Sequence, residues 1–201
     1  TDLFVHLCTT IHYLMNAKAP SKVMAMGQLY RWKESRDVPD TLNALLEYPE
    51  GFSVNLSSTF NNQSTAEGSF QFLGTEGTLS LEWGRLLYQP ESAREDNKWI
   101  VESWPKRLEE AYWKDPKVRE QELPATWNAR MVDAETAFRE QGRDATVDHF
   151  GHLLESIRTR KPYWQDAGAG HRAAACAHMV NRSVTTGKMV EWDFTKDDIK
   201  A

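Results

Sequence analysis

Asp2 and His6 stand four residues apart at the head of the apolar run TDLFVHLCTTIHYLM. On a helix, residues at this spacing lie on one face, so the carboxylate can reach the imidazole. A carboxylate that holds one ring nitrogen fixes the tautomer and leaves the other nitrogen free as a base. The positive end of the helix dipole acts in the opposite sense, because it disfavours an imidazolium in the first turn. Taken alone, the pair is also explained by an N-cap aspartate and a partly buried helix histidine, and this plainer interpretation is favoured.

A second set of candidate residues lies in the segment DATVDHFGHLLESIRTRKP and consists of Asp148, His149, His152 and Glu155. His149 and His152 are three residues apart and could ligate a metal ion from one face of a helix. The segment has neither cysteine partners nor an HExxH pattern. Ordinary histidines of an amphipathic helix therefore explain it better.

The remaining residue types that suggest chemistry have simpler explanations. His171 and His178 are interpreted as lone histidines on a later helix. Gly168 and Gly170 in DAGAGH follow no strand and lack the GxGxxG spacing, so they indicate a helix start rather than a phosphate-binding loop. The sequence shows no Ser-His-Asp arrangement and no paired-cysteine metal site.

The composition excludes several classes of partner. The chain has 24 basic against 29 acidic residues, for a net charge of -5, and its basic residues are scattered among acids. This pattern argues against a nucleic-acid or anionic-membrane binder. No apolar run approaches the ~20 residues of a membrane span. Cys8 and Cys176 both lie in apolar helical patterns, which favours buried free thiols and a reducing compartment.

Hydrophobic periodicity predicts a helix, a meander of strands, two more helices and a final strand. The first helix is expected at residues 2–15, with Thr1 or Asp2 as its cap. The later helices are expected at 144–162, capped by Asp144, and within 166–188, ending before Gly187. Strands are expected at residues 21–32, 41–48, 52–60, 69–74, 77–83, 85–89 and 189–194. The order indicates an α+β domain with a predominantly antiparallel open sheet and helices packed on one face.

The middle of the chain, from about residue 91 to 143, has a different character. Strand alternation stops there, charge density rises, and short helices are expected between Pro105, Pro116 and Pro124. Four tryptophans fall in the same region: Trp99, Trp104, Trp113 and Trp127. We interpret residues 1–201 as a single domain that carries this tryptophan-rich, charged insertion.

The order and spacing of these segments resemble the C-terminal domain of the Gfo/Idh/MocA family (glucose-fructose oxidoreductase and inositol dehydrogenase). TDLFVHLCTTIHYLM is similar to the family's opening helix, which starts with an Asp-x-x-x-His pair, and FLGTEGTLSLEW is similar to its turn-and-strand segment. HFGHLLESIRTRKPYWQDAGAGHRAAACAHMVNRSVTTGKMVEW resembles its closing helices and last strand. The resemblance covers most of the chain except roughly residues 91–143. It implies that the family's N-terminal Rossmann domain, which binds NAD or NADP and carries a Glu-Lys-Pro motif, is absent from these residues.

The resemblance also implies roles for individual residues. Asp2 and His6 match the family's catalytic pair, with His6 as acid/base or substrate-hydroxyl ligand and Asp2 orienting it. Thr9 and His12 fall at positions expected to contribute to substrate binding. Many members have Gly where this chain has Phe4, a change expected to narrow the approach to the site. Many have Asp where this chain has Thr9, a change that removes a carboxylate.

The implied function is that of a substrate-binding and oligomerisation domain of an NAD(P)-dependent oxidoreductase acting on a sugar, cyclitol or related polyol. The chain alone is expected to bind no cofactor, to be inactive, and to form a homo-oligomer through its open sheet face. The alternatives are a non-catalytic sugar-binding or scaffolding relative, an NAD-dependent glycosidase of the same family, and, ranked lowest, a metal hydrolase built on Asp2, His6, His149 and His152. The expected location is cytoplasmic, or periplasmic if a signal precedes Thr1.

Overall fold

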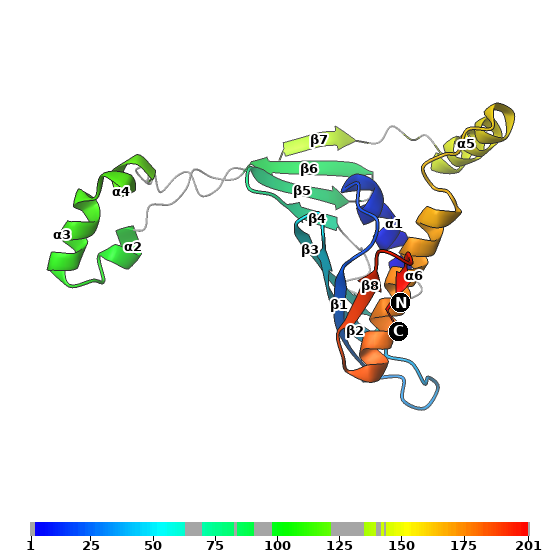
Figure 1. Ribbon diagram of the computed structural model, residues 1–201, viewed down its shortest axis with the longest axis horizontal. Coiled ribbons are helices and arrows are strands. Elements are labelled where there is room, and N and C mark those ends of the chain that lie inside the picture. The colour runs from blue at the N-terminus through cyan, green and yellow to red at the C-terminus, as the bar shows by residue number, and fades with distance from the viewer. Residues whose placement is uncertain are drawn as a thin grey trace. The chain divides into compact units, whose positions relative to one another are not determined.

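The computed structural model describes residues 3–62, 70–82, 84–90, 98–121, 135–139, 142 and 144–200 (Figure 1). The chain divides into two compact units, one formed by Thr1–Ala66 with Asp144–Ala201 and the other by Glu67–Arg143. All four residues of the expected site fall within the first unit. The interpretation of the whole chain as one functional domain stays a prediction.

A five-stranded sheet in the order β3-β2-β1-β8-β9 forms the framework of the first unit. Its strands are β1 (Lys22–Gln28), β2 (Thr41–Tyr48), β3 (Phe52–Thr59), β8 (Val190–Asp193) and β9 (Asp198–Ile199). All their pairings are antiparallel. The hairpin between β2 and β3 turns at Gly51, whose φ of 91° is a conformation that glycine adopts without steric cost.

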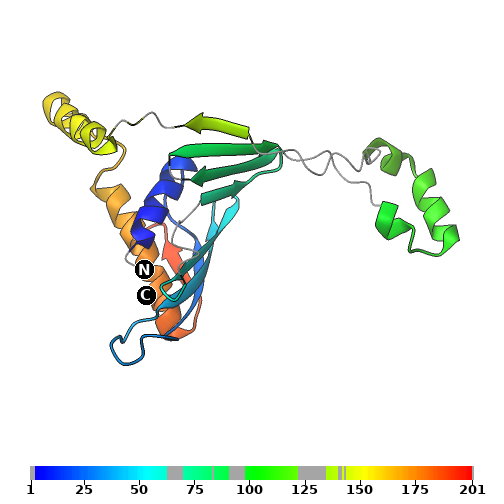
Figure 2. The same cartoon turned by 180° about the vertical axis from the view of Figure 1, so that it is seen from behind.

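Two helices cover one face of this sheet. α6 (Ala167–Thr186) lies on β1 and β8, and α1 (Phe4–Leu14) packs beside α6 (Figures 1 and 2). Asp166 caps α6 by accepting a hydrogen bond from the backbone N–H of Ala169 at 2.8 Å. The helix ends at Gly187, which adopts the left-handed conformation at a φ of 65°.

The core of the first unit lies between these helices and the covered face of the sheet. α6 is rich in alanine on its inner face, which lets its backbone approach the strands closely. The sheet contributes larger side chains, and each of these stabilises the fold by ~1.5–3 kcal/mol through burial. The buried side chains include Val23, Leu42, Leu46 and Tyr48 from the sheet, Phe4, Cys8 and Ile11 from α1, and Ala173, Cys176, Ala177 and Val180 from α6.

The opposite face of the sheet is open to solvent. Alternate residues of β3, namely Ser53, Asn55 and Ser57, are exposed there. The neighbouring strands add apolar side chains to the same face, with Met26 76% and Leu45 62% exposed. The open face is therefore mixed in character, with a small polar edge at β3 and an apolar centre at β1 and β2.

α5 (Ala145–Thr159) precedes α6 in the chain and begins at the predicted cap, where Asp144 accepts a hydrogen bond from Thr146 N at 2.8 Å. It ends at Arg160, which has a φ of 57°. Its predicted apolar stripe, Val147, Phe150, Leu153, Leu154 and Ile157, is exposed at every position. Periodicity thus correctly predicts the helix but does not indicate whether its apolar stripe is buried. The corresponding stripe of α6 is mostly buried.

The second unit holds a four-stranded antiparallel sheet in the order β4-β5-β6-β7. Its strands are β4 (Phe70–Leu73), β5 (Gly77–Glu82), β6 (Arg85–Pro90) and β7 (Glu135–Arg139). Three short helices belong to the same unit: α2 (Lys98–Val101), α3 (Lys106–Lys114) and α4 (Pro116–Gln121). Pro105 precedes α3 and Pro116 opens α4, as predicted, while Pro124 lies outside the described residues.

The predicted fold class is confirmed, because antiparallel open sheets combine with helices packed on a sheet face. The strands form two sheets rather than one. Two strands were not predicted: β7, inside the segment where strand alternation was expected to stop, and β9 near the end of the chain. Among the described helices, none is both long and apolar enough to cross a membrane.

Candidate active site

α1 presents two different faces, and His6 lies on the one turned away from the core. Phe4, Cys8 and Ile11 follow one another at helical spacing and are buried. At roughly 100° per residue, His6 points about 160° away from both Phe4 and Cys8. Its side chain is accordingly exposed. An exposed imidazole on this helix is available to a ligand from solvent.

The partner expected for His6 lies outside the described residues. Leu3 occupies the N-cap position of α1 and makes no side-chain cap hydrogen bond, so the structure does not place Thr1 or Asp2 there. The described helix begins at Phe4, later than the sequence predicted. The pairing of Asp2 with His6 therefore stays a prediction.

The two departures from the family pattern differ in their structural consequences. The side chain of Phe4 is buried with Cys8 on the face opposite His6, so its expected effect on the approach to the site has no direct support here and stays a prediction. Thr9 is half-buried and lies one helical turn from His6, on the adjoining side of the helix. Thr9 thus stands near enough to His6 for both to contact one ligand.

His12 turns inward, towards the sheet, rather than towards His6. It lies about 120° around the helix from His6. Its Nε2 is 3.0 Å from the hydroxyl oxygen of Tyr48 on β2, and the two rings meet edge to face with centroids 5.7 Å apart. The ring of Tyr48 in turn stacks on Phe52, at 4.5 Å between centroids. His12 is therefore a contact between α1 and the sheet, and its expected part in substrate binding remains untested.

The electrostatic surroundings keep His12 neutral. Partial burial, and secondarily the positive charge of Arg172, lower the pKa of His12 from 6.5 to about 4. Arg172 is itself held by Asp197, with Nε 3.0 Å from Oδ1 and Nη2 2.9 Å from Oδ2. A neutral imidazole accepts at one nitrogen, so the tautomer protonated at Nδ1 receives the Tyr48 O–H at Nε2. Tyr48 and Arg172 were both missed by the sequence analysis, because nothing local in the sequence indicates that they meet His12.

This lowered pKa makes stability depend on pH in a defined window. Between pH 6.5 and about 4 the unfolded chain binds a proton at His12 that the folded chain does not. The free energy of unfolding should therefore fall as pH falls through this window, by somewhat less than the ~1.4 kcal/mol per pH unit of a fully shifted proton, because the ring is half-exposed. We expect His12→Gln, which keeps an acceptor for Tyr48, to flatten this slope in urea unfolding measured across the window. His178→Gln, on an exposed helix position, is the matched control, and an unchanged slope in His12→Gln would contradict the assignment.

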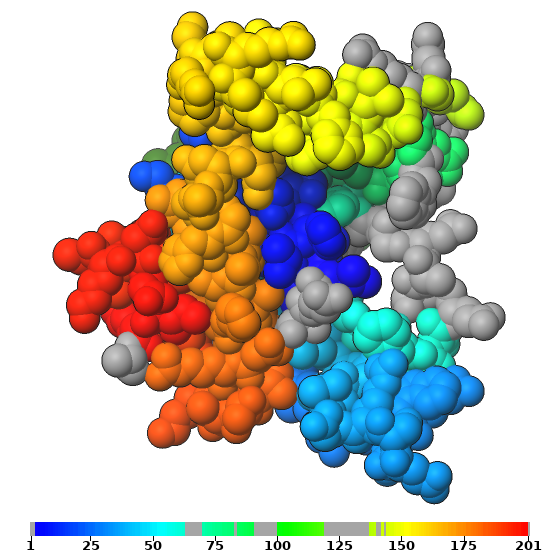
Figure 3. Space-filling model, turned by 90° about the vertical axis from the view of Figure 1, so that its right-hand side faces the viewer, coloured from blue at the N-terminus to red at the C-terminus, as the bar shows by residue number. Residues whose placement is uncertain are grey.

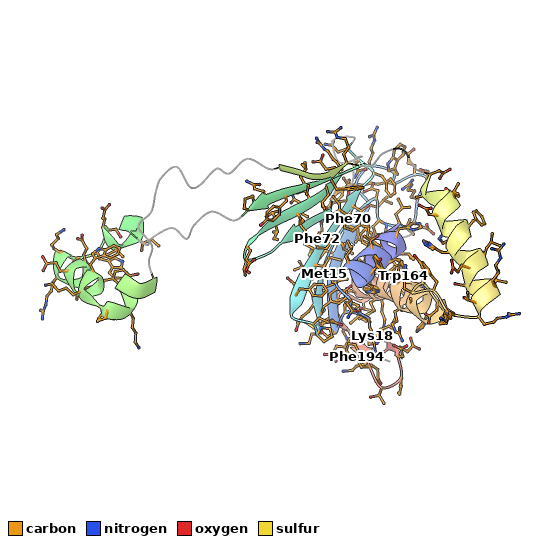
Figure 4. All side chains as sticks on the ribbon, turned by 90° about the horizontal axis from the view of Figure 1, so that it is seen from above. Met15, Lys18, Phe70, Phe72, Trp164 and Phe194 are labelled. Atoms are coloured by element: carbon orange, nitrogen blue, oxygen red, sulfur yellow. The ribbon has the colours of Figure 1, made fainter. Side chains whose placement is uncertain are left out.

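The far end of α1 is fastened by aromatic contacts. The ring of Tyr13 lies 4.3 Å from that of Trp164, in the segment before α6, and Figure 4 shows Trp164 beside the helix. Tyr163, next to Trp164 in the same segment, stacks on the ring of His152 of α5, with 4.5 Å between ring centroids. In Figure 3 α1 (blue) and α6 (orange) lie side by side at the surface. The helix that carries His6 is thus held along its length by α6, Tyr48 and Trp164.

The other histidines do not join this site. His149 and His152 are exposed on α5, and His152 is engaged with Tyr163. His171 Nε2 lies 2.9 Å from the carbonyl oxygen of Asp197, and His178 is exposed on α6. Within the described part of the chain, no group of three or more His, Cys, Asp or Glu side chains could hold a metal ion.

The chain was compared with protein families, with curated proteins and with solved structures. The family model of the GFO/IDH/MocA C-terminal domain matches residues 1–80, which include α1 and β1–β3, and this confirms the resemblance found in the sequence. No curated protein matches the chain in sequence. Solved structures do match it.

Three of the similar structures are described here. The aldose-aldose oxidoreductase from Caulobacter crescentus, complexed with glycerol, has a TM-score of 0.64 and 14% identity over 94% of this chain and 45% of its own. Levoglucosan dehydrogenase in complex with NADH and levoglucosan has a TM-score of 0.62 and 13% identity, over 94% of this chain and 49% of its own. The UDP-N-acetylglucosamine 3-dehydrogenase GnnA from Acidithiobacillus ferrooxidans has a TM-score of 0.60 and 16% identity, over 91% of this chain and 46% of its own. At these identities the similarity is one of fold, and the chain spans less than half the length of each of these proteins.

Proposed function

We propose that this chain is the substrate-binding and oligomerisation domain of an NAD(P)-dependent oxidoreductase that acts on a sugar, cyclitol or related polyol. The observation that carries the proposal is the exposed His6 on α1, within the segment that the GFO/IDH/MocA C-terminal model matches. The fold neighbours support the substrate class, since one is complexed with glycerol and another with levoglucosan and NADH.

In this proposal His6 moves a proton at the substrate. An exposed imidazole can accept the proton of a substrate hydroxyl and return it in the reverse direction. Asp2, four residues earlier, would hold the other ring nitrogen and so select the tautomer. Thr9 offers a hydroxyl one turn away, where it can donate to or accept from a second hydroxyl of a polyol. Polyols present adjacent hydroxyl groups, and this pair of side chains suits them.

The described residues do not form a dinucleotide site. Such sites use a parallel βαβ unit with a Gly-rich turn at the helix start. Every strand pair in the described ranges is antiparallel, and α6 follows α5 rather than a strand. We therefore assign nucleotide binding to a separate domain, and none of the chemistry ascribed to His6 requires this chain to hold the nucleotide.

Self-association completes the proposal. The open face of the first sheet exposes Met24, Met26 and Leu45 beside the polar row of β3. Apolar side chains at the centre of an exposed, regular sheet face are typical of a surface that another subunit covers. We propose that two copies of the chain meet there.

The isolated chain is expected to bind NADH or NADPH only weakly and to oxidise no polyol. The reason is the absence of a pyrophosphate cradle among the described residues. Isothermal titration of the 201-residue chain with each nucleotide, beside the complete open reading frame that encodes it, is the measurement. Tight, stoichiometric binding by the chain alone would contradict the assignment. A complete protein that binds sugar but neither nucleotide would indicate a non-catalytic sugar-binding relative instead.

A further inference from the structure

Two thiols from distant parts of the chain meet in the core of the first unit. Cys8 of α1 and Cys176 of α6 are the two cysteines of the chain. Their Sγ atoms are 3.0 Å apart, and both side chains are completely buried as free thiols. A disulfide bond has an S–S length of about 2.05 Å, so a movement of roughly 1 Å would bring the two sulfur atoms to bonding distance.

The thiols stand at the end of a polar chain that leads outwards. The hydroxyl of Tyr48 interacts with the sulfur of Cys176 and lies 3.0 Å from Nε2 of the half-buried His12. The single O–H of Tyr48 can be donated either to the sulfur of Cys176 or to Nε2 of His12, so Tyr48 connects the two groups. Tyr48 and His12 therefore connect the buried thiols to the edge of the core. The contact with Cys8, together with burial, raises the pKa of Cys176, so its thiolate is a minor form at neutral pH and oxidation by peroxide should be slow there.

We propose that Cys8 and Cys176 form a reversible disulfide that fastens α1 to α6. The oxidant is hydrogen peroxide, a small molecule that must reach two fully buried sulfur atoms. One thiol displaces water from hydrogen peroxide and becomes a sulfenic acid, and the second thiol then attacks that sulfur and releases a second water. Two thiols and one peroxide give one disulfide and two waters. A dithiol reductant reverses the reaction by exchange.

The cross-link would act directly on the candidate active site. Cys8 lies two residues beyond His6 on the same helix, so the bond would anchor the helix that carries the imidazole. It would also convert the Cys176 thiol that contacts Tyr48 into a disulfide sulfur. The oxidised form should therefore hold α1 more rigidly than the reduced form.

The test uses the folded chain and hydrogen peroxide. After treatment with peroxide below the unfolding temperature, the number of thiols titrated in denaturant should fall from two to none. Trypsin digestion without reductant should yield one linked species that joins the peptide ending at Lys18 to peptide 173–182. The thermal midpoint should rise by roughly 5 °C or more and return to its starting value with dithiothreitol.

Several results would overturn the proposal. Two titratable thiols after exposure, sulfinic acid on either cysteine, or a disulfide between chains would each exclude an internal bridge. Cys8→Ser and Cys176→Ser provide controls, because neither should give the linked peptides or the reversible rise in midpoint. Should a serine variant fail to fold, the peptide map of the unsubstituted chain decides the matter alone. The outcome is independent of the proposed redox function, since it needs neither nucleotide nor polyol.

Discussion

Replacing His6 with asparagine in the complete protein is expected to lower kcat/KM for polyol oxidation by roughly 10²–10⁴-fold, the usual contribution of a positioned acid or base. Asparagine is polar and of similar size, but it cannot accept and return a proton. Because His6 is exposed and makes no contribution to the buried stripe of α1, the fold should be unaffected. Steady-state rates with each nucleotide across a set of polyols, together with a thermal unfolding curve, measure both effects.

His178→Asn is the matched control for this experiment, as it removes an exposed histidine from α6 rather than from α1. It should leave kcat/KM within about twofold of the unsubstituted protein, in line with surface substitutions remote from a site. If the two variants lose activity equally, or if His6→Asn loses none, His6 does not move the proton. Binding of polyol that survives in His6→Asn would assign the residue to chemistry rather than to affinity.

Local signals in the sequence predicted much of the fold because their physical causes are local. Asp144 and Asp166 cap helices by hydrogen bonds to N–H groups two and three residues ahead, and Gly187 ends a helix through its own backbone conformation. The alternation of β2 and β3 likewise records which face of each strand meets the core. None of these features requires knowledge of distant residues.

The features that were missed depend on partners far along the chain. β7 is a strand because its residues pair with β6, more than forty positions earlier, and ETAFR alone has too few alternating residues to indicate this. His12 turns inward because Tyr48 lies opposite it on β2. The burial of Phe4 likewise depends on a distant partner, since an apolar residue near the start of α1 can point either way until the packing of α6 is known.

Asp40 illustrates the same limit in the segment between β1 and β2, at a position for which the sequence analysis made no prediction. Its carboxylate is buried and accepts hydrogen bonds from the backbone N–H groups of Tyr30, Arg31 and Trp32 and from the side chain of Asn61. These hydrogen bonds hold the pKa of Asp40 well below its usual range, against the opposing effect of desolvation. The backbone N–H groups that donate to Asp40 lie eight to ten residues before it, and this spacing leaves no periodic signal in the sequence.

The second large effect concerns the neighbours Leu45 and Leu46 on β2, which lie on opposite faces of the sheet. Leu46→Ala is expected to lower the free energy of unfolding by ~2–5 kcal/mol, because its side chain is 1% exposed beneath the helices and its loss leaves a cavity. Leu45→Ala, at a position 62% exposed, should change it by no more than about 0.5 kcal/mol. Urea unfolding of both variants under conditions that keep the chain monomeric measures the difference.

The same pair separates stability from assembly. If copies of the chain meet through the open face, Leu45→Ala should weaken self-association in sedimentation velocity while the isolated fold keeps its stability. Leu46→Ala should leave the association of folded molecules unchanged, since its side chain does not reach that face. Equal destabilisation by both substitutions would show that a further segment covers Leu45 within the chain. The proposed subunit contact would then have to lie elsewhere, because a face already covered cannot receive a second copy.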